Sequence, residues 1–167
     1  GALDTAKVLA AAIGRAEGYD LVLAATESSD GYTGTVPEQI AAVLGLPSIT
    51  FAKSVEVADG TVKVKRQTEA GYDECESPLP ALVSVTAGVV EPRYPSFKGI
   101  MAAKSKPVDT VTVADLGIDA AIVGWAGAGQ EIVDVAAAPE REGGEVIEDD
   151  GEAHLKIVAF LDELKVL

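Results

Sequence analysis

The sequence predicts an α/β fold with a mostly parallel, doubly wound sheet, an inserted antiparallel meander, and a C-terminal extended arm that ends in a helix. Three observations lead to this prediction. Helical and strand-like segments alternate over residues 4–52, which is the pattern of a parallel α/β sheet. Short alternating segments joined by glycine turns follow. The last part is rich in Ala, Gly and Val and closes with an amphipathic segment.

The first predicted helix covers residues 4–15, because its larger apolar side chains recur on one face and Asp4 or Thr5 can cap its start. Residues 20–25 follow as a continuous apolar run, which predicts a strand covered on both faces. A doubly wound domain normally opens with a strand, whereas this chain opens within a helix. We therefore expect residues 1–118 to be the C-terminal portion of such a domain, with its N-terminal part absent.

A polar loop at residues 26–36 leads into the second predicted helix. Pro37 suits the first turn of that helix, and Gly45 suits its C-terminal cap. A further strand is expected at residues 48–52. A loop between a buried strand and a helix is where open α/β sheets bind ligands, so this loop is the first candidate site.

An antiparallel meander is predicted next, from segments at 54–57, 61–67 and 72–75 whose side chains alternate in character. An Asp-Gly pair between the first two segments is a strong hairpin signal. Residues 81–86 then form another buried strand. With that strand, the parallel part of the sheet is expected to be Rossmann-like.

The C-terminal part is expected to lie outside the compact core. Residues 108–113 alternate as a short strand, and residues 114–117 follow as a turn. We interpret residues 119–167 as an arm and a helix, and the family resemblance given below implies that they pack on a partner. The helix is expected at residues 152–164, where apolar side chains recur at helical spacing.

Composition excludes several classes of function. The 167 residues carry a formal net charge of −14, which disfavours binding to nucleic acid or to an anionic membrane surface. No run of apolar residues is long enough for a membrane span, so no direct membrane insertion is expected. One cysteine and one histidine leave little for a metal site or a disulfide framework, which fits a reducing compartment.

The loop at residues 25–36 has the groups that hold a phosphate through backbone and hydroxyl contacts. Gly31 and Gly34 permit a close backbone approach, and the following helix offers free amide groups. The loop has no Lys or Arg, while Glu27 and Asp30 are acidic, so one phosphate suits it better than three. An ordinary Ser/Gly-rich connection accounts equally well for the same spacing.

The segment at residues 91–106 combines the prolines and the glycine typical of a loop with large apolar side chains. Two prolines favour an extended first half, and helix formers follow Gly99. An apolar anchor on a loop is typical of docking surfaces, but the pattern alone favours simple packing over the sheet. The apolar and basic members are Pro92, Arg93, Tyr94, Phe97, Ile100, Met101, Lys104 and Lys106.

Several segments together resemble one family, the beta subunit of electron transfer flavoprotein. They occur in the family's order over nearly the whole chain, although the family's first strand has no counterpart here. The strongest resemblance is Glu91-Pro-Arg-Tyr-Pro-Ser-Phe-Lys-Gly-Ile-Met-Ala-Ala-Lys. The other matching segments are Asp20–Leu23, Ser29–Pro37, Gly45–Pro47, Val62–Arg66, Leu79–Val83, Ala114–Gly117 and Pro139–Glu145.

The resemblance implies an electron carrier of the adenine-nucleotide-binding α/β type, without bond chemistry of its own. Such a subunit pairs with an alpha subunit that holds FAD. The heterodimer accepts electrons from acyl-CoA dehydrogenases and related dehydrogenases, as in fatty acid β-oxidation, and passes them to a quinone reductase. The resemblance also implies a cytoplasmic protein in bacteria, or a mitochondrial matrix protein in a eukaryote.

The resemblance also implies a role for each loop. The segment at residues 91–106 becomes the recognition loop for the dehydrogenase, with Phe97 as its apolar anchor and Lys104 and Lys106 beside it. The loop before the second helix becomes the site of a structural AMP. Its residues are Ala25, Thr26, Glu27, Ser28, Ser29, Asp30, Gly31, Tyr32, Thr33, Gly34, Thr35 and Val36.

Two alternatives remain open from the sequence. A bifurcating relative would bind a second FAD in place of AMP. A stand-alone AMP-binding module would need no redox partner, although it would leave Val158 and Leu161 of the final helix poorly covered.

Overall fold

The computed structural model describes residues 1–140, 143–144 and 146–166. Arg141, Glu142 and Glu145 of the expected arm lie outside these residues. The chain divides into two compact units, Gly1–Glu131 and Ile132–Leu167. Each unit is described by itself.

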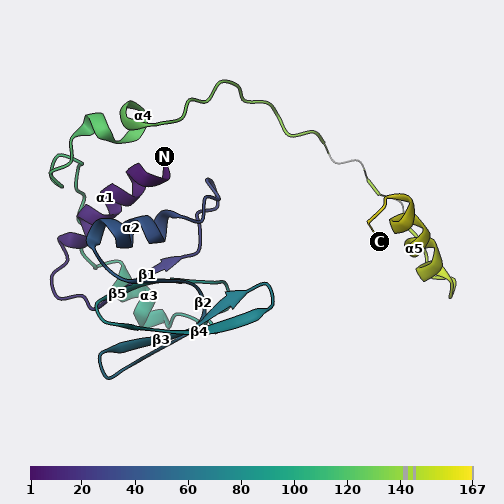
Figure 1. The fold of residues 1–167 in the computed structure, drawn as a ribbon, viewed down its shortest axis with the longest axis horizontal. Helices are drawn as coiled ribbons and strands as arrows, with labels where there is room; N and C mark the ends of the chain where they lie inside the picture. Colours follow the sequence, from purple (N-terminus) through teal and green to yellow (C-terminus); the bar gives the residue numbers. More distant parts are fainter. Residues whose placement is uncertain (141–142, 145, 167) are drawn as a thin grey trace. The chain divides into compact units, whose positions relative to one another are not determined.

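The first unit is built on a five-stranded mixed sheet (Figure 1). Its strands are β1 (Leu21–Ala25), β2 (Ser48–Ala58), β3 (Thr61–Thr68), β4 (Gly71–Pro78) and β5 (Ala81–Val85). They lie in the order β1-β5-β2-β3-β4. The pairings β1–β5 and β5–β2 are parallel, whereas β2–β3 and β3–β4 are antiparallel. The α/β class and the antiparallel insertion are thus confirmed, with parallel pairing confined to one half of the sheet.

Two helices, α1 (Ala2–Gly14) and α2 (Val36–Leu44), pack on one face of the parallel half (Figure 1). α1 begins ahead of the predicted caps, so Asp4 lies in its first turn. α2 ends at Gly45, whose φ of 68° is the left-handed conformation expected of a glycine cap. The cluster between helices and sheet consists of Ala6, Ala10, Ile40, Ala41 and Leu82.

One long strand, β2, replaces the two separate strands expected at 48–52 and 54–57. Its first part pairs with β5 and its second part with β3. The register shifts between Ala52 and Ser54 in the pairing with β3, and a bulge lies between Ile49 and Ala52 in the pairing with β5. Phe51 has a φ of 56° at this bulge, and its amide donates to Oγ of Ser84 at 3.2 Å. The bulge redirects the strand from its parallel partner to its antiparallel partner, so one continuous strand serves both pairings.

The second core cluster lies among the strands themselves. It consists of Ile49, Ala52, Val62, Val64, Ala81 and Val83, all of them buried. The turn between β2 and β3 places Asp59 and Gly60 at φ values of 52° and 73°, as the Asp-Gly hairpin signal predicts. The meander contributes Val62 and Val64 to this cluster, and the strands that pair in parallel contribute the other four residues.

The segment after β5 is irregular until Ser96, whose hydroxyl accepts from the amide of Gly99 at 3.1 Å and caps helix α3 (Phe97–Ala103). The strand predicted at 108–113 is wrong. The amide of Thr112 donates instead to Oδ2 of Asp115 at 2.7 Å, within the predicted turn. The backbone amides of a strand donate to a neighbouring strand, whereas here the amide of Thr112 donates to the side chain of Asp115.

Two short helices follow that turn, where the sequence predicted only an arm. They are η1 (Ala120–Ile122), capped by the carboxylate of Asp119, and α4 (Gly124–Gly127). Gly127 lies directly against the backbone of Ile122, where a Cβ would clash. Its lack of a side chain lets the chain fold back at this point.

The second unit contains helix α5 (Ala153–Glu163), close to the predicted bounds. The described residues of this unit between 132 and 149 form no helix or strand. Nζ of Lys156 lies 2.6 Å from Oδ2 of Asp150, just ahead of the helix. Among the described residues, no helix is both long and apolar enough to cross a membrane.

Candidate nucleotide cleft and recognition loop

A cleft of about 510 Å³ opens where β1 ends and α2 begins. The carboxyl end of a parallel strand and the start of the next helix form one wall each, as in other open α/β sheets. The volume falls within the range of small-molecule sites. Its lining residues are Ala2, Thr5, Leu9, Ala24, Ala25, Glu27, Ser28, Asp30, Gly31, Thr33, Gly34, Val36, Pro37 and Ile40.

Most of the residues predicted for the nucleotide loop line this cleft. Thr26, Ser29, Tyr32 and Thr35 are the four of the predicted set that do not. Thr26 instead ties the start of the loop to the sheet, because its hydroxyl donates to the carbonyl of Val85 at 2.9 Å. The structure thus brings a continuous stretch of sequence around one hollow, and every third residue from Thr26 to Thr35 lies outside the lining.

A tight turn shapes the middle of the loop. The amide of Gly31 donates to Oγ of Ser28 at 3.3 Å, and the amide of Tyr32 donates to the carbonyl of Ser28 at 3.2 Å. Tyr32 has a φ of 46°, and Gly34 has a φ of 62°. Two left-handed residues within three positions turn the chain sharply, so that backbone rather than long side chains faces the cleft.

The first turn of α2 is open toward an anion. In the described part of the chain, Thr35 caps the helix without a side-chain hydrogen bond to its amides. Oγ of Thr35 accepts instead from Nε2 of Gln39 at 3.2 Å. The free amides and the positive end of the helix dipole favour a phosphate or another anion near this terminus.

The charged side chains that line the cleft are both acidic. They are Glu27 and Asp30, and the lining contains no Lys, Arg or His. The Ser28 hydroxyl, together with the amides of Asp30 and Gly31, holds the pKa of Asp30 below its ordinary value of 3.8. The cleft thus offers hydroxyls and backbone amides rather than cationic side chains to a ligand.

The sequence did not single out the helical residues that line the cleft. Leu9 of α1 and Ile40 of α2 form apolar walls, and Leu9 is exposed in this unit. The available signal was the apolar face of each helix. No place in the fold was assigned to the apolar face of the first helix from the sequence, and the structure shows that part of that face borders the cleft.

The predicted recognition loop exposes its apolar side chains. Tyr94 is 99% exposed and Phe97 is 80% exposed, and Ile100 and Met101 are about half exposed. Phe97 is the first residue of α3, held in place by the Ser96 cap. In the described unit these side chains do not fold back over the sheet, so the packing interpretation of the pattern is not met. The remaining predicted members of the loop, Pro92, Arg93, Lys104 and Lys106, are also exposed.

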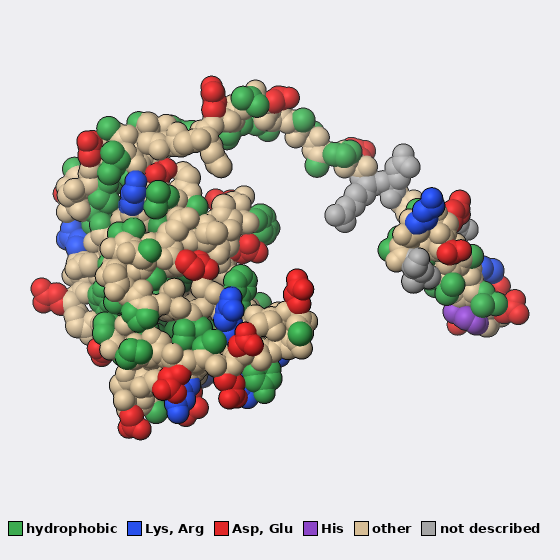
Figure 2. All heavy atoms as spheres, in the orientation of Figure 1, with side chains coloured by type: hydrophobic (Ala, Val, Ile, Leu, Met, Phe, Trp, Pro, Cys, Tyr) green, Lys and Arg blue, Asp and Glu red, His purple; other side chains and the backbone are tan. Residues whose placement is uncertain are grey.

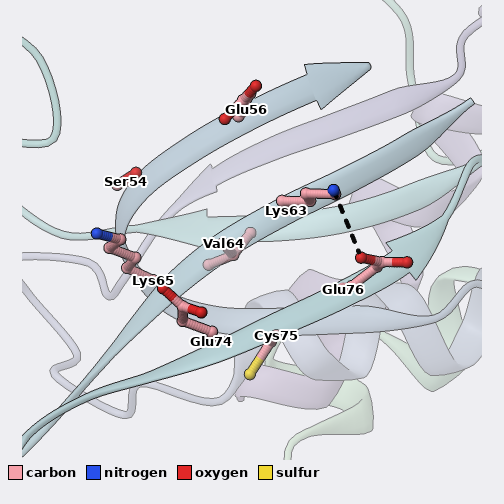
Figure 3. Close-up of a pocket in the computed structure, with 8 residues that line it drawn as sticks. All are labelled: Ser54, Glu56, Lys63, Val64, Lys65, Glu74, Cys75 and Glu76. Atoms are coloured by element: carbon pink, nitrogen blue, oxygen red, sulfur yellow. Dashed lines mark ion pairs between the residues drawn. The ribbon is translucent and has the colours of Figure 1, made fainter. Parts of the chain in front are cut away.

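A separate polar hollow of about 310 Å³ lies on the meander (Figure 3). Lys63 of β3 lies opposite Glu56 of β2 and Glu76 of β4, and its Nζ is 3.9 Å from Oε2 of Glu76. Cys75 is registered with Val64, whose side chain is in the core. Such cross-strand pairs are typical of a solvated sheet face. No cluster of metal-ligating side chains occurs in the described part of the chain.

Comparison with known proteins identifies the family. The electron transfer flavoprotein domain matches residues 2–116. The chain is 41% identical over 165 residues to the electron transfer flavoprotein subunit beta of Mycobacterium tuberculosis, and 42% identical over 165 residues to that of Mycobacterium leprae. In each case the match covers 99% of this chain and 62% of the relative. The chain thus spans less than two thirds of these relatives.

A third relative has a different name. The caffeyl-CoA reductase-Etf complex subunit CarD of Acetobacterium woodii is 34% identical over 143 residues, which cover 86% of this chain and 55% of CarD. The match to the Mycobacterium tuberculosis beta subunit covers the loop at residues 25–36, the meander and the loop at residues 91–106 in a single alignment. The chain belongs to the electron transfer flavoprotein family and is a homologue of its beta subunits.

Proposed function

We propose that this chain acts as an electron transfer flavoprotein beta subunit that carries electrons without bond chemistry of its own. It pairs with an alpha subunit that holds FAD, and FAD supplies the redox chemistry. The heterodimer accepts electrons from acyl-CoA dehydrogenases and related dehydrogenases, as in fatty acid β-oxidation, and delivers them to a quinone reductase. A cytoplasmic location in bacteria, or the mitochondrial matrix in a eukaryote, fits this role.

The observation that carries the proposal is the cleft beside the loop at residues 25–36, in a chain of this family. Its composition fits a structural AMP. The amides at the start of α2 and the hydroxyls of Ser28 and Thr33 suit one phosphate, while Leu9 and Ile40 offer apolar walls to an adenine ring. The strands β1, β5 and the first part of β2 then belong to a Rossmann-like, doubly wound nucleotide-binding domain. Residues 1–118 would form the C-terminal portion of that domain.

We assign docking of the dehydrogenase to the loop at residues 91–106. Phe97 is exposed on the first turn of α3, where a partner's pocket can enclose it. Lys98, Lys104 and Lys106 lie on or beside the same helix and would meet acidic groups around that pocket. An aromatic anchor with a polar rim is the usual form of a binding hot spot.

Phe97→Ala tests this assignment. Loss of a hot-spot anchor costs about 2 kcal/mol, so we expect kcat/KM for electron acceptance from an acyl-CoA dehydrogenase to fall about 30-fold. The flavin content of the heterodimer should stay normal, because the residue is not assigned to cofactor binding. Val57→Ala, which trims another half-exposed apolar side chain on β2, is the matched control. An unchanged rate with Phe97→Ala would remove the anchor role.

We assign residues 119–167 to contact with the alpha subunit. Leu155, Val158 and Phe160 of α5 are each more than half exposed within their unit. A helix with such a surface needs cover from another chain. This need also argues against the stand-alone AMP-binding module.

A second candidate is a bifurcating-type subunit that binds a second FAD in place of AMP. The similarity to CarD, a subunit of a caffeyl-CoA reductase-Etf complex, is the observation that favours it. The acidic lining of the cleft disfavours it, because FAD carries two phosphates where AMP carries one. The two candidates differ in the number of flavins that each heterodimer holds.

A further inference from the structure

Glu27 lies at the point of the cleft where a ligand's anionic group would approach α2. It follows β1 by two residues and lines the cleft. Its Oε2 atom is 3.6 Å from the position that a Cβ on Gly34 would take. Gly34 precedes the helix cap Thr35, so the carboxylate of Glu27 reaches across the loop to the approach to the helix terminus.

The charge of Glu27 is not offset within the cleft. The other charged lining residue is Asp30, a second carboxylate, whose pKa the Ser28 hydroxyl and the neighbouring amides lower. The favourable groups for an anion are therefore the backbone amides of α2 and the hydroxyls. These groups suit a compact anion, whereas each further negative charge would be repelled by the carboxylates of Glu27 and Asp30.

We infer that Glu27 is a specificity-determining residue that limits the bound adenine nucleotide to a single phosphate group. This inference rests on the proposed nucleotide site. The carboxylate repels every phosphate, and the repulsion grows with the charge of the phosphate chain. AMP is consequently accepted, while ADP, ATP and the diphosphate of FAD are disfavoured.

Glu27→Gln removes the charge and keeps the shape of the side chain. Nucleotide affinities are measured by isothermal titration of the full-length protein in its heterodimer, after bound nucleotide has been exchanged out. One charge pair near a protein surface corresponds to about tenfold in affinity, so we expect ADP to bind about tenfold more tightly to the variant. AMP should gain less, about threefold, so that the preference for AMP over ADP narrows.

Glu69→Gln is the matched control, because it removes one carboxylate from the exposed turn between β3 and β4. It should leave the ratio of AMP to ADP affinities unchanged. If Glu27→Gln does not fold, the same inference is tested by measuring the AMP and ADP affinities of the unchanged protein at several ionic strengths. Salt screens the repulsion between an exposed carboxylate and a phosphate, whereas it would weaken the attraction between a phosphate and a cationic group. With Glu27 dominant, the preference for AMP over ADP should shrink as salt rises from about 0.05 to 0.5 M.

The outcomes separate this inference from the proposed site. If the unchanged protein binds neither AMP nor ADP, the nucleotide site itself is wrong. If AMP binds and Glu27→Gln leaves the AMP-to-ADP ratio at its original value, the site stands and the role of Glu27 is overturned. In the salt series, a ratio that stays constant or widens with salt overturns it in the same way.

Discussion

Single residues decide where this sheet changes its pairing, and Phe51 is the clearest case. Its φ of 56° is a conformation that bulky residues rarely adopt. Ser84, 2% exposed, accepts from its amide and so satisfies a donor that the bulge removes from the ladder. A phenylalanine gives no sequence signal for a left-handed conformation, which is why a break between two strands was predicted in place of one bulged strand.

Replacing Ser84 with Ala should destabilise the protein through this amide. The substitution leaves the Phe51 N–H without its acceptor in a partly buried position, which costs about 1–2 kcal/mol. Equilibrium urea unfolding measures the loss as a lower midpoint at constant slope. Ser48→Ala, at an exposed serine of β2, should stay within about 0.5 kcal/mol of the original. Equal stability of both variants would show that the Ser84 bond contributes nothing.

At the scale of elements, prediction succeeded where local signals and tertiary pairing agree. α2 has a proline in its first turn and a glycine at its C-terminal cap, and the β2–β3 hairpin has an Asp-Gly turn. It failed at residues 108–113, where alternation of side chains was interpreted as a strand. Alternation says which faces a strand would have, but a strand also needs a free sheet edge beside it. Here Asp115 binds both the amide and the hydroxyl of Thr112 at 2.7 Å instead.

The turn around Asp115 should make stability depend on acid pH. The Thr112 amide and then the Thr112 hydroxyl lower the pKa of Asp115 below its ordinary value of 3.8. Since the folded pKa lies below the unfolded one, this contribution is fully present above pH 3.8 and is lost as the pH falls through the folded pKa. Asp115→Asn should therefore lower the melting temperature at pH 7, and the difference from the original protein should vanish in strong acid.

Thermal unfolding across a pH series, followed by circular dichroism, measures that difference. Asp109→Asn alters an exposed aspartate in the irregular segment just before the turn and serves as the control. It should track the original protein at every pH. A melting-temperature gap for Asp115→Asn that persists unchanged into acid would assign its effect to shape rather than charge.

For the whole molecule, the order of elements predicted the place of the cleft but not its full lining. The rule that ligands bind at the carboxyl ends of parallel strands needs only the β1–α2 order, so the loop at residues 25–36 could be chosen from sequence. The contribution of Leu9 depends on how far α1 extends beyond the sheet, which no local pattern records. The acidic character predicted from the composition is also visible on the surface of the first unit (Figure 2). The chain has 27 acidic against 13 basic residues, and Figure 2 shows acidic side chains spread over the visible face of the first unit.

That acidic balance leads to a prediction about the cofactor content of the complete heterodimer. Because the cleft has two carboxylates and no cationic side chain in its lining, a second FAD would have to place its diphosphate against uncompensated charge. We expect one FAD and one AMP per heterodimer. Denaturing the purified complex and quantifying the released flavin and adenine nucleotide by chromatography gives both numbers, and native mass spectrometry of the intact complex checks the sum. The original complex reconstituted with excess FAD is the control, since it should still retain only one flavin after gel filtration. Two flavins per heterodimer would instead establish the bifurcating type, and the carboxylates of the cleft would then have to be neutralised by groups from outside the described part of the chain.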